Sequence, residues 1–265
     1  MKRIVVVGAS TGLGRCIAVS LAARGGKVAL MARTVEKLNG AVEEAGENAI
    51  GIRCDVTDEV SCKSAIAEAA ERLGGIDAII YAAAVGPISR VEDATADQWK
   101  STFETNVMGA SLITSAALPH LLESSGTAIY FSTVGASYTS HWPGLAVYQV
   151  TKAALERLVD AWRNEHPSVG FTRLTLGECG GGQGDSQSHF NVGWDPDVTM
   201  ALAPSWFARG LLSGALMDIE HLVDAISGLV EAGASLTIPT MIITPRASHV
   251  STQTNLESLA EQHAS

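Results

Sequence analysis

Short runs of aliphatic and β-branched residues alternate along the chain with longer stretches whose apolar residues recur at helical spacing. Most of the runs are continuously apolar, which is typical of parallel strands buried on both faces. The predicted strands span residues 3–7, 28–31, 49–53, 78–81, 128–131, 172–176 and 237–243, and the predicted helices span 13–24, 35–45, 59–73, 96–122, 146–164 and 219–232. This alternation predicts an α/β fold, a single-domain, doubly wound, seven-stranded parallel sheet with helices on both faces.

Local sequence signals predict several helix ends, and two segments depart from the strand–helix alternation. Asp58 is a predicted N-cap, and Gly25, Gly46 and Gly74 are predicted stops. Residues 177–193 are rich in glycine, serine and aspartate, which predicts a flexible loop, and we expect a lid at about 177–215. The folded domain is expected to cover residues 1–246, with a polar C-terminal tail at 247–265.

Composition and charge exclude several classes of function. The chain has 265 residues, 46% of them hydrophobic, and a formal net charge of −10 without a basic run, which argues against nucleic acid as a partner. Its longest mostly apolar run, 78–88, is too short to span a bilayer, and the apolar stretch at 4–7 is too short for an export signal. The four cysteines form no C-x-x-C pair or zinc pattern. We therefore expect a cytoplasmic protein without a metal site.

The clearest motif follows the first predicted strand. Gly8-Ala9-Ser10-Thr11-Gly12-Leu13-Gly14 connects this strand to a helix, as a dinucleotide-binding turn of the Rossmann type requires. Gly8 permits the tight turn, Gly12 lets the backbone approach a pyrophosphate, and Gly14 lets helix and strand pack closely. The same letters also match the G-x-S-x-G elbow of serine hydrolases, with Ser10 as nucleophile, but only seven residues precede Gly8, whereas that elbow follows several strands.

The end of the second strand bears on the choice of nucleotide. An NAD site would carry a carboxylate here for the ribose 2′-hydroxyl, but this chain reads Met31-Ala32-Arg33-Thr34. The guanidinium of Arg33 can form a charge-assisted fork with a 2′-phosphate. The sequence therefore favours NADP(H) as cofactor.

A tyrosine and a lysine are placed one helical turn apart in Tyr148-Gln149-Val150-Thr151-Lys152. A phenol has a pKa of about 10 and exchanges protons poorly near neutrality unless a cation stabilises the phenolate. Lys152 can supply that cation, but the spacing taken alone is equally compatible with an ordinary exposed pair on a helix.

Together these motifs make the chain resemble the short-chain dehydrogenases/reductases over nearly all of its length, up to about residue 246. The matching segments are the glycine turn, Asp55-Val56, Asn106-Val107-Met108-Gly109, Ser132-Thr133, Tyr148 and Lys152. The resemblance implies that Tyr148 is the acid/base and that Lys152 lowers its pKa and binds the nicotinamide ribose. It further implies that Asn106 helps to hold a proton-relay water and that Asp55 and Val56 border the adenine. A homodimer or homotetramer is implied as well.

Several segments depart from the family pattern. The register of 129–133 puts Thr133 where the substrate-orienting serine usually stands, but the segment to Tyr148 is about two residues longer than usual, so Ser132 and Ser137 remain alternatives. Tyr81-Ala82-Ala83-Ala84 replaces Asn-Asn-Ala-Gly, and Gly177-Glu178 replaces Pro-Gly. Backbone contacts to the cofactor from Ala82, Ala83 and Gly177 survive these changes, but side-chain contacts from the asparagines do not.

The sequence thus predicts an NADP(H)-dependent oxidoreductase that interconverts a carbonyl and an alcohol. Bulky residues at Phe190, Trp194, Met200, Trp206, Phe207 and Met217 fall in the region that the family uses as a lid. Packing explains most of them, but any that line the pocket favour a small apolar substrate over a charged one. Alternatives are a cofactor-binding sensor or scaffold with weakened catalysis, an epimerase or dehydratase, and the hydrolase that uses Ser10.

Overall fold

The structure is a computed structural model that describes residues 1–212 and 214–246; the predicted tail at 247–265 lies outside the described residues. Its centre is one parallel sheet in the order β3-β2-β1-β4-β5-β6-β7, which confirms the predicted fold class. The strands are β1 (Arg3–Val7), β2 (Lys27–Ala32), β3 (Ala49–Arg53), β4 (Ala78–Tyr81), β5 (Thr127–Thr133), β6 (Gly170–Leu176) and β7 (Thr240–Ile243). Four of the five residues of β1 and all four residues of β4 are buried, as the continuous apolar runs predict.

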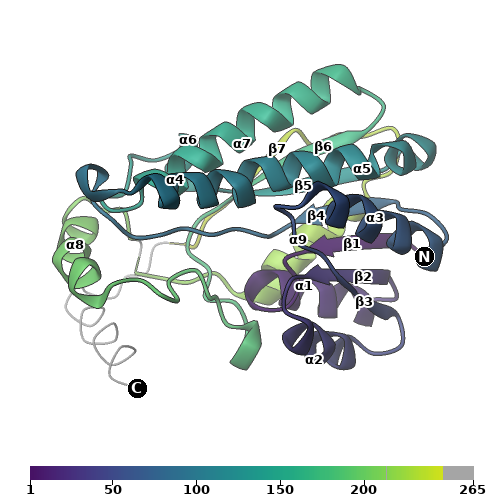
Figure 1. Ribbon diagram of the computed structural model, residues 1–265, viewed down its shortest axis with the longest axis horizontal. Helices are drawn as coiled ribbons and strands as arrows, with labels where there is room; N and C mark the ends of the chain where they lie inside the picture. The colour runs from purple at the N-terminus through teal and green to yellow at the C-terminus, as the bar shows by residue number, and fades with distance from the viewer. Residues whose placement is uncertain (213, 247–265) are drawn as a thin grey trace.

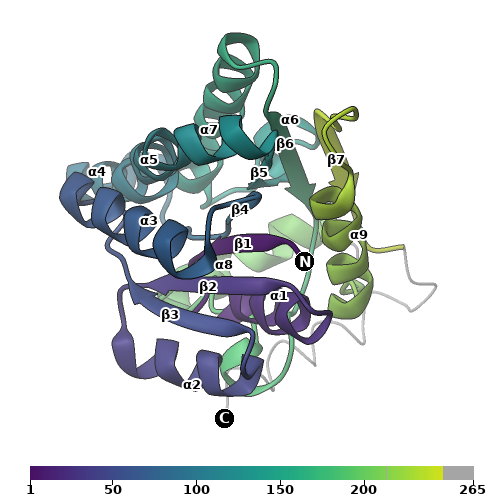
Figure 2. The ribbon, with the colours of Figure 1, turned by 90° about the vertical axis from the view of Figure 1, so that its right-hand side faces the viewer.

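Helices cover both faces of this sheet (Figures 1 and 2). One face carries α1 (Gly12–Ala23), α2 (Val35–Ala45) and α9 (Ile219–Glu231), and the other carries α3 (Glu59–Leu73), α5 (Gly109–Ser124) and α7 (Ala146–Glu165). Each layer buries its own apolar core, one around the side chains of Val6 and Leu30 and the other around those of Val5 and Tyr130. No helix in the described part of the chain is long and apolar enough to cross a membrane.

The predicted helix signals are confirmed at several positions. The Asp58 carboxylate accepts hydrogen bonds from the backbone N–H groups of Val60 and Ser61, and Gly74 ends α3 in the left-handed conformation. The predicted single helix 96–122 is wrong in one respect. It is divided into α4 (Ala96–Phe103), a π-turn at Glu104–Met108 and α5, and the π-turn has a local cause described with the site below.

The carboxyl ends of the parallel strands lie along one edge of the sheet, and the candidate site is located there. The strand order reverses between β1 and β4, and α/β proteins bind ligands in the crevice beyond such a point. A helix that the sequence analysis does not predict, α8 (Pro196–Ala208), lies beyond this edge (Figure 1). Two sequence signals mark its start, since the Asp195 carboxylate caps Asp197 and Val198 and Pro196 occupies the first turn. The short helix α6 (Val134–Ser137) follows β5 at the same edge.

Candidate active site

The glycine turn lies between β1 and α1 and is closed by backbone packing. Gly8 has φ +83°, and a side chain there would approach the backbone nitrogen of Ala83 to 2.6 Å. A side chain at Gly14 would overlap the carbonyl oxygen of Gly8. The Ala82 N–H donates to the carbonyl of Val7, so the segment after β4 lies directly against the turn. Gly8, Gly14, Ala82 and Ala83 therefore lie close together in the structure.

The first turn of α1 suits an anionic ligand. Thr11 is its N-cap residue, yet the Thr11 side chain makes no cap hydrogen bond, and Gly12 and Leu13 begin the helix without an acidic side chain in the first turn. The N–H groups of a helix start are therefore available to a phosphate. Ser10 lies in the same turn, and in residues 1–212 and 214–246 no hydrogen bond joins its hydroxyl to a histidine.

Two exposed arginines stand at the carboxyl ends of neighbouring strands. Arg53 ends β3 beside Ala32 of β2, and Arg33 follows Ala32 directly. The pKa of Asp55 is lowered, first by the hydrogen bond from the Thr57 backbone N–H and further by the positive charges of Arg33 and Arg53. Arg33 and Arg53 thus lie near the Asp55 carboxylate, and Arg33 has no ion-pair partner within 4 Å among the described residues.

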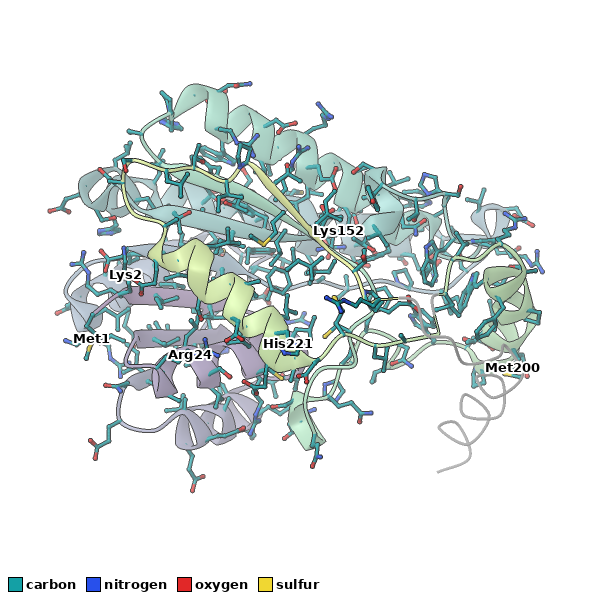
Figure 3. The ribbon with its side chains drawn as sticks, turned by 180° about the vertical axis from the view of Figure 1, so that it is seen from behind. Met1, Lys2, Arg24, Lys152, Met200 and His221 are labelled. Carbon is teal, nitrogen blue, oxygen red and sulfur yellow. The ribbon has the colours of Figure 1, made fainter. Side chains whose placement is uncertain are left out.

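Tyr148 and Lys152 lie on the side of α7 that faces the sheet, and Figure 3 marks Lys152 there. The Lys152 ammonium nitrogen lies 5.7 Å from the centre of the Tyr148 ring and donates a hydrogen bond of 2.7 Å to the carbonyl of Phe131. Burial lowers the pKa of Lys152 to about 7, and burial raises the pKa of Tyr148 above its usual value. Geometry therefore brings the predicted pair together, and desolvation favours its uncharged form.

Asn106 is fully buried at the π-turn between α4 and α5. Its side-chain oxygen accepts from the Val85 N–H, and its side-chain nitrogen donates to the Val85 carbonyl and to the Thr151 hydroxyl, each at 2.9 Å. The Tyr81 hydroxyl donates to the carbonyl of Thr105 at 2.6 Å. These bonds satisfy backbone and side-chain groups outside the helix, which explains why a π-turn forms within the predicted continuous helix.

The three candidate hydroxyls, two at the end of β5 and one on α6, have different surroundings. The Ser132 hydroxyl is buried and donates to the Glu156 carboxylate at 2.6 Å. Thr133 is partly buried at the end of the strand, and its hydroxyl has no hydrogen-bond partner among the described residues. Ser137 is exposed at the end of α6.

The predicted lid packs onto both halves of this site. Gly12 faces the backbone of residues 187–189 at ordinary contact distance. The Cys16 thiol donates to the Ser186 carbonyl, and Asp185 pairs with Arg15 at 3.5 Å. The Phe190 ring lies 4.6 Å from that of Tyr148, centre to centre. Residues 184–190 therefore extend from the glycine turn to Tyr148.

An aromatic cluster continues from Phe190 toward α8. The cluster consists of Phe190, Trp194, Trp206 and Trp142, with neighbouring ring centres 5.3–6.2 Å apart. The indole N–H groups of Trp194 and Trp206 donate to the carbonyls of Gly86 and Pro143. Met200 lies on the exposed side of α8 (Figure 3), and Met217 packs against the core near α1, so neither belongs to the cluster.

Sequence reasoning missed three residues that support the site: Tyr81, Thr151 and Glu156. In the sequence, Tyr81 stands out only as a departure from the family pattern, and Thr151 is only one of the residues between Tyr148 and Lys152. A signal for Glu156 exists, because it is four residues after Lys152 and so shares the buried face of α7. Gly177, by contrast, was predicted and lies directly after β6, where its N–H donates to the Ile243 carbonyl. In the described ranges no group of three or more His, Cys, Asp or Glu could hold a metal ion.

Comparison with known proteins gives consistent matches. A family model described as short chain dehydrogenase matches residues 2–180. An uncharacterized oxidoreductase of Listeria monocytogenes is 35% identical over 179 residues, which cover 66% of this chain and 71% of the relative. An uncharacterized oxidoreductase of Staphylococcus aureus is 30% identical over 223 residues, which cover 83% of this chain and 93% of the relative.

Solved structures share the fold. An alcohol dehydrogenase from Thermococcus sibiricus, complexed with 5-hydroxy-NADP, superposes with a TM-score of 0.76 at 23% identity and covers 95% of this chain and 98% of its own. A 3-ketoacyl-ACP reductase from Sinorhizobium meliloti has a TM-score of 0.76 at 22% identity, with coverage of 91% and 96%.

Proposed function

The chain belongs to the short-chain dehydrogenase family of oxidoreductases, and from that premise we propose that it interconverts a carbonyl and an alcohol with NADP(H). The observation that carries the proposal is the placement of Tyr148 and Lys152 on one face of α7, with the ammonium nitrogen 5.7 Å from the phenol ring. Lys152 binds the carbonyl of Phe131 in β5, and two residues later, at the end of this strand, Thr133 offers a hydroxyl with no hydrogen-bond partner among the described residues. A bound nicotinamide would supply the hydride.

Each residue then has a defined task in carbonyl reduction. Tyr148 donates a proton to the substrate oxygen, and Thr133 donates a hydrogen bond that orients the same oxygen. Lys152, when charged, stabilises the resulting phenolate. Asn106 holds α7 through Thr151 and holds the loop after β4 through Val85.

The glycine turn and Arg33 support the choice of NADP(H). The first turn of α1 fits a pyrophosphate, because its N–H groups have no side-chain cap and no acidic side chain beside them. Arg33 lies free of an ion pair in the described chain, and the exposed Arg53 ends the neighbouring strand. A 2′-phosphate would gain a charge-assisted bond there, whereas a 2′-hydroxyl would gain less.

The aromatic cluster supports a small apolar substrate. Phe190 contacts the Tyr148 ring, and the rings of Trp194, Trp206 and Trp142 continue the apolar surface from it. A carbonyl compound with an apolar body would bury apolar area against these rings, and that burial favours binding.

We also propose assembly into a homodimer or homotetramer. Met108 at the π-turn, Leu122 on α5 and Val150 on α7 are large apolar side chains exposed by 54%, 42% and 39%. These exposed residues come from the helices on one face of the sheet, and a second copy of the chain would cover such apolar surface.

Nucleotide binding tests the cofactor proposal. Purified protein is titrated with NADPH and NADH, and the same is done with Arg33→Ala and with Arg72→Ala, an exposed arginine at the far end of α3, as control. We expect NADPH to bind roughly tenfold tighter or more in the wild type and the control, and Arg33→Ala to remove that preference. Equal affinities in the wild type would refute the assignment to NADP(H).

Turnover tests the chemistry. Tyr148→Phe removes the phenolic proton and little volume, so it should bind NADPH normally and lower kcat by at least about 100-fold with any active carbonyl substrate. Full turnover in this variant would contradict the role of Tyr148. A wild type that binds NADPH but turns over no carbonyl or alcohol would favour a cofactor-binding sensor or scaffold instead.

A further inference from the structure

Two side chains of α7, one helical turn apart, hold consecutive residues of β5. The Lys152 ammonium donates to the carbonyl of Phe131 at 2.7 Å, and the Glu156 carboxylate accepts from the hydroxyl of Ser132 at 2.6 Å. Lys152, Glu156 and Ser132 are all buried, with 1%, 4% and 5% of their surface exposed. The next residue of the strand is Thr133. The end of β5 is therefore fixed to the catalytic helix immediately before its last side chain.

A carboxylate at this depth needs its partners. Burying a charge costs several kcal/mol, and a well-packed apolar side chain of similar size would avoid that cost. The second oxygen of Glu156 lies 3.9 Å from the guanidinium of Arg173 on β6, which in turn pairs with Asp160 at 3.5 Å. Packing alone therefore does not account for Glu156, whereas a strong bond to Ser132 does.

The hydroxyls of Ser132 and Thr133 differ in their hydrogen bonds. A serine hydroxyl has one proton to donate, and Ser132 gives it to Glu156. Side chains alternate along a strand, so Ser132 and Thr133 point to opposite faces. Ser132 points to the layer of α7, and Thr133 keeps a proton that it can donate to a substrate oxygen.

We propose that Glu156 is a positioning residue that, through the Ser132 hydroxyl, sets the direction in which the Thr133 hydroxyl and the Phe131 carbonyl are presented to the site. Ser132 is then a structural link and Thr133 the catalytic hydroxyl. The inference rests on the proposed function, since it assigns roles within carbonyl reduction. It extends the site by one turn of α7 beyond Lys152.

Four single variants test this assignment, measured with a carbonyl substrate that Tyr148→Phe no longer reduces. Thr133→Val should lower kcat by about 100-fold, as the loss of a transition-state hydrogen bond does. Ser132→Ala and Glu156→Leu should each lower kcat about tenfold, with KM and NADPH affinity unchanged. Glu156→Gln keeps an acceptor oxygen and should restore most of the wild-type kcat. The double variant of Ser132→Ala and Glu156→Leu should be no slower than either single variant.

The outcomes discriminate between the roles. If Ser132→Ala abolishes turnover while Thr133→Val and Glu156→Leu remain active, Ser132 is the catalytic hydroxyl and the inference is overturned. Unchanged kcat in both Ser132→Ala and Glu156→Leu would also overturn it, because the bond would then serve stability alone. Ser132→Ala removes a single oxygen, so it keeps the test decisive if Glu156→Leu does not fold. A wild type without carbonyl turnover would overturn the proposed function instead.

Discussion

Replacing Lys152 by methionine should change the pH dependence of stability. The substitution keeps the length of the side chain and removes the titrating group. Lys152 is 1% exposed, and within the described part of the chain its ammonium donates a hydrogen bond to the Phe131 carbonyl. Its pKa falls from 10.5 to about 7 because burial removes the charge from water.

The magnitude and the sign follow from that pKa. One pKa unit corresponds to about 1.4 kcal/mol, so charging Lys152 in the folded protein costs roughly 5 kcal/mol more than in the unfolded chain. Between about pH 7 and 10.5 the unfolded chain binds one more proton than the folded protein, so the free energy of unfolding rises with pH in this window. From pH 6 to pH 9 this group alone should raise it by about 3 kcal/mol.

Urea denaturation of the protein without added nucleotide measures the effect. Wild type, Lys152→Met and Lys63→Met are compared from pH 6 to pH 9, where the raised pKa of Tyr148 keeps the phenol neutral. Lys63 is an exposed lysine of α3 and serves as control. We expect the stability of the wild type relative to Lys152→Met to rise by about 3 kcal/mol, and that relative to Lys63→Met to stay nearly constant. A constant difference for Lys152→Met would refute the depressed pKa.

Three other substitutions test separate contacts. Gly14→Ala would place a methyl group on the carbonyl of the turn's first glycine, so it should destabilise the protein by several kcal/mol in denaturation and abolish NADPH binding. Tyr81→Phe removes the bond to the Thr105 carbonyl and should cost about 1–3 kcal/mol in unfolding free energy, with kcat lowered because the π-turn loses its anchor. Asp185→Asn removes the ion pair between Asp185 and Arg15. The Asp185 side chain is half exposed, so the melting temperature should change little, while the association of NADPH, measured by stopped flow, should become faster.

The sheet could be predicted from sequence because its strands are buried on both faces. Arg3–Val7, Ala49–Arg53 and Ala78–Tyr81 have the predicted bounds, and the other strands differ at their ends. The π-turn could not be predicted in this way. Its cause is a set of contacts from β4 and α7, remote in sequence, that act on a segment with continuous helical spacing.

In the site too, contacts between neighbours in the sequence could be predicted, whereas contacts between separate elements could not. Tyr148 and Lys152 are neighbours on a helix, so their spacing alone indicates that they meet, and the structure brings them together. The choice between Ser132 and Thr133 depends on which hydroxyl a side chain of another element engages, and sequence spacing carries no such information. The position of residues 184–190 on α1 likewise depends on tertiary contacts such as that of Cys16 with Ser186.

Burial acts on both Tyr148 and Lys152, and in both it favours the uncharged form. It lowers the pKa of Lys152 to about 7 and raises that of Tyr148, so the residues of the chain alone hold an amine and a phenol near neutral pH. An anionic ligand bound near the ammonium would raise the pKa of Lys152, and a charged Lys152 would in turn lower the pKa of Tyr148. A charged Lys152 therefore favours the proposed acid/base role of Tyr148, and the buried setting of Lys152 makes that charge sensitive to what binds beside it.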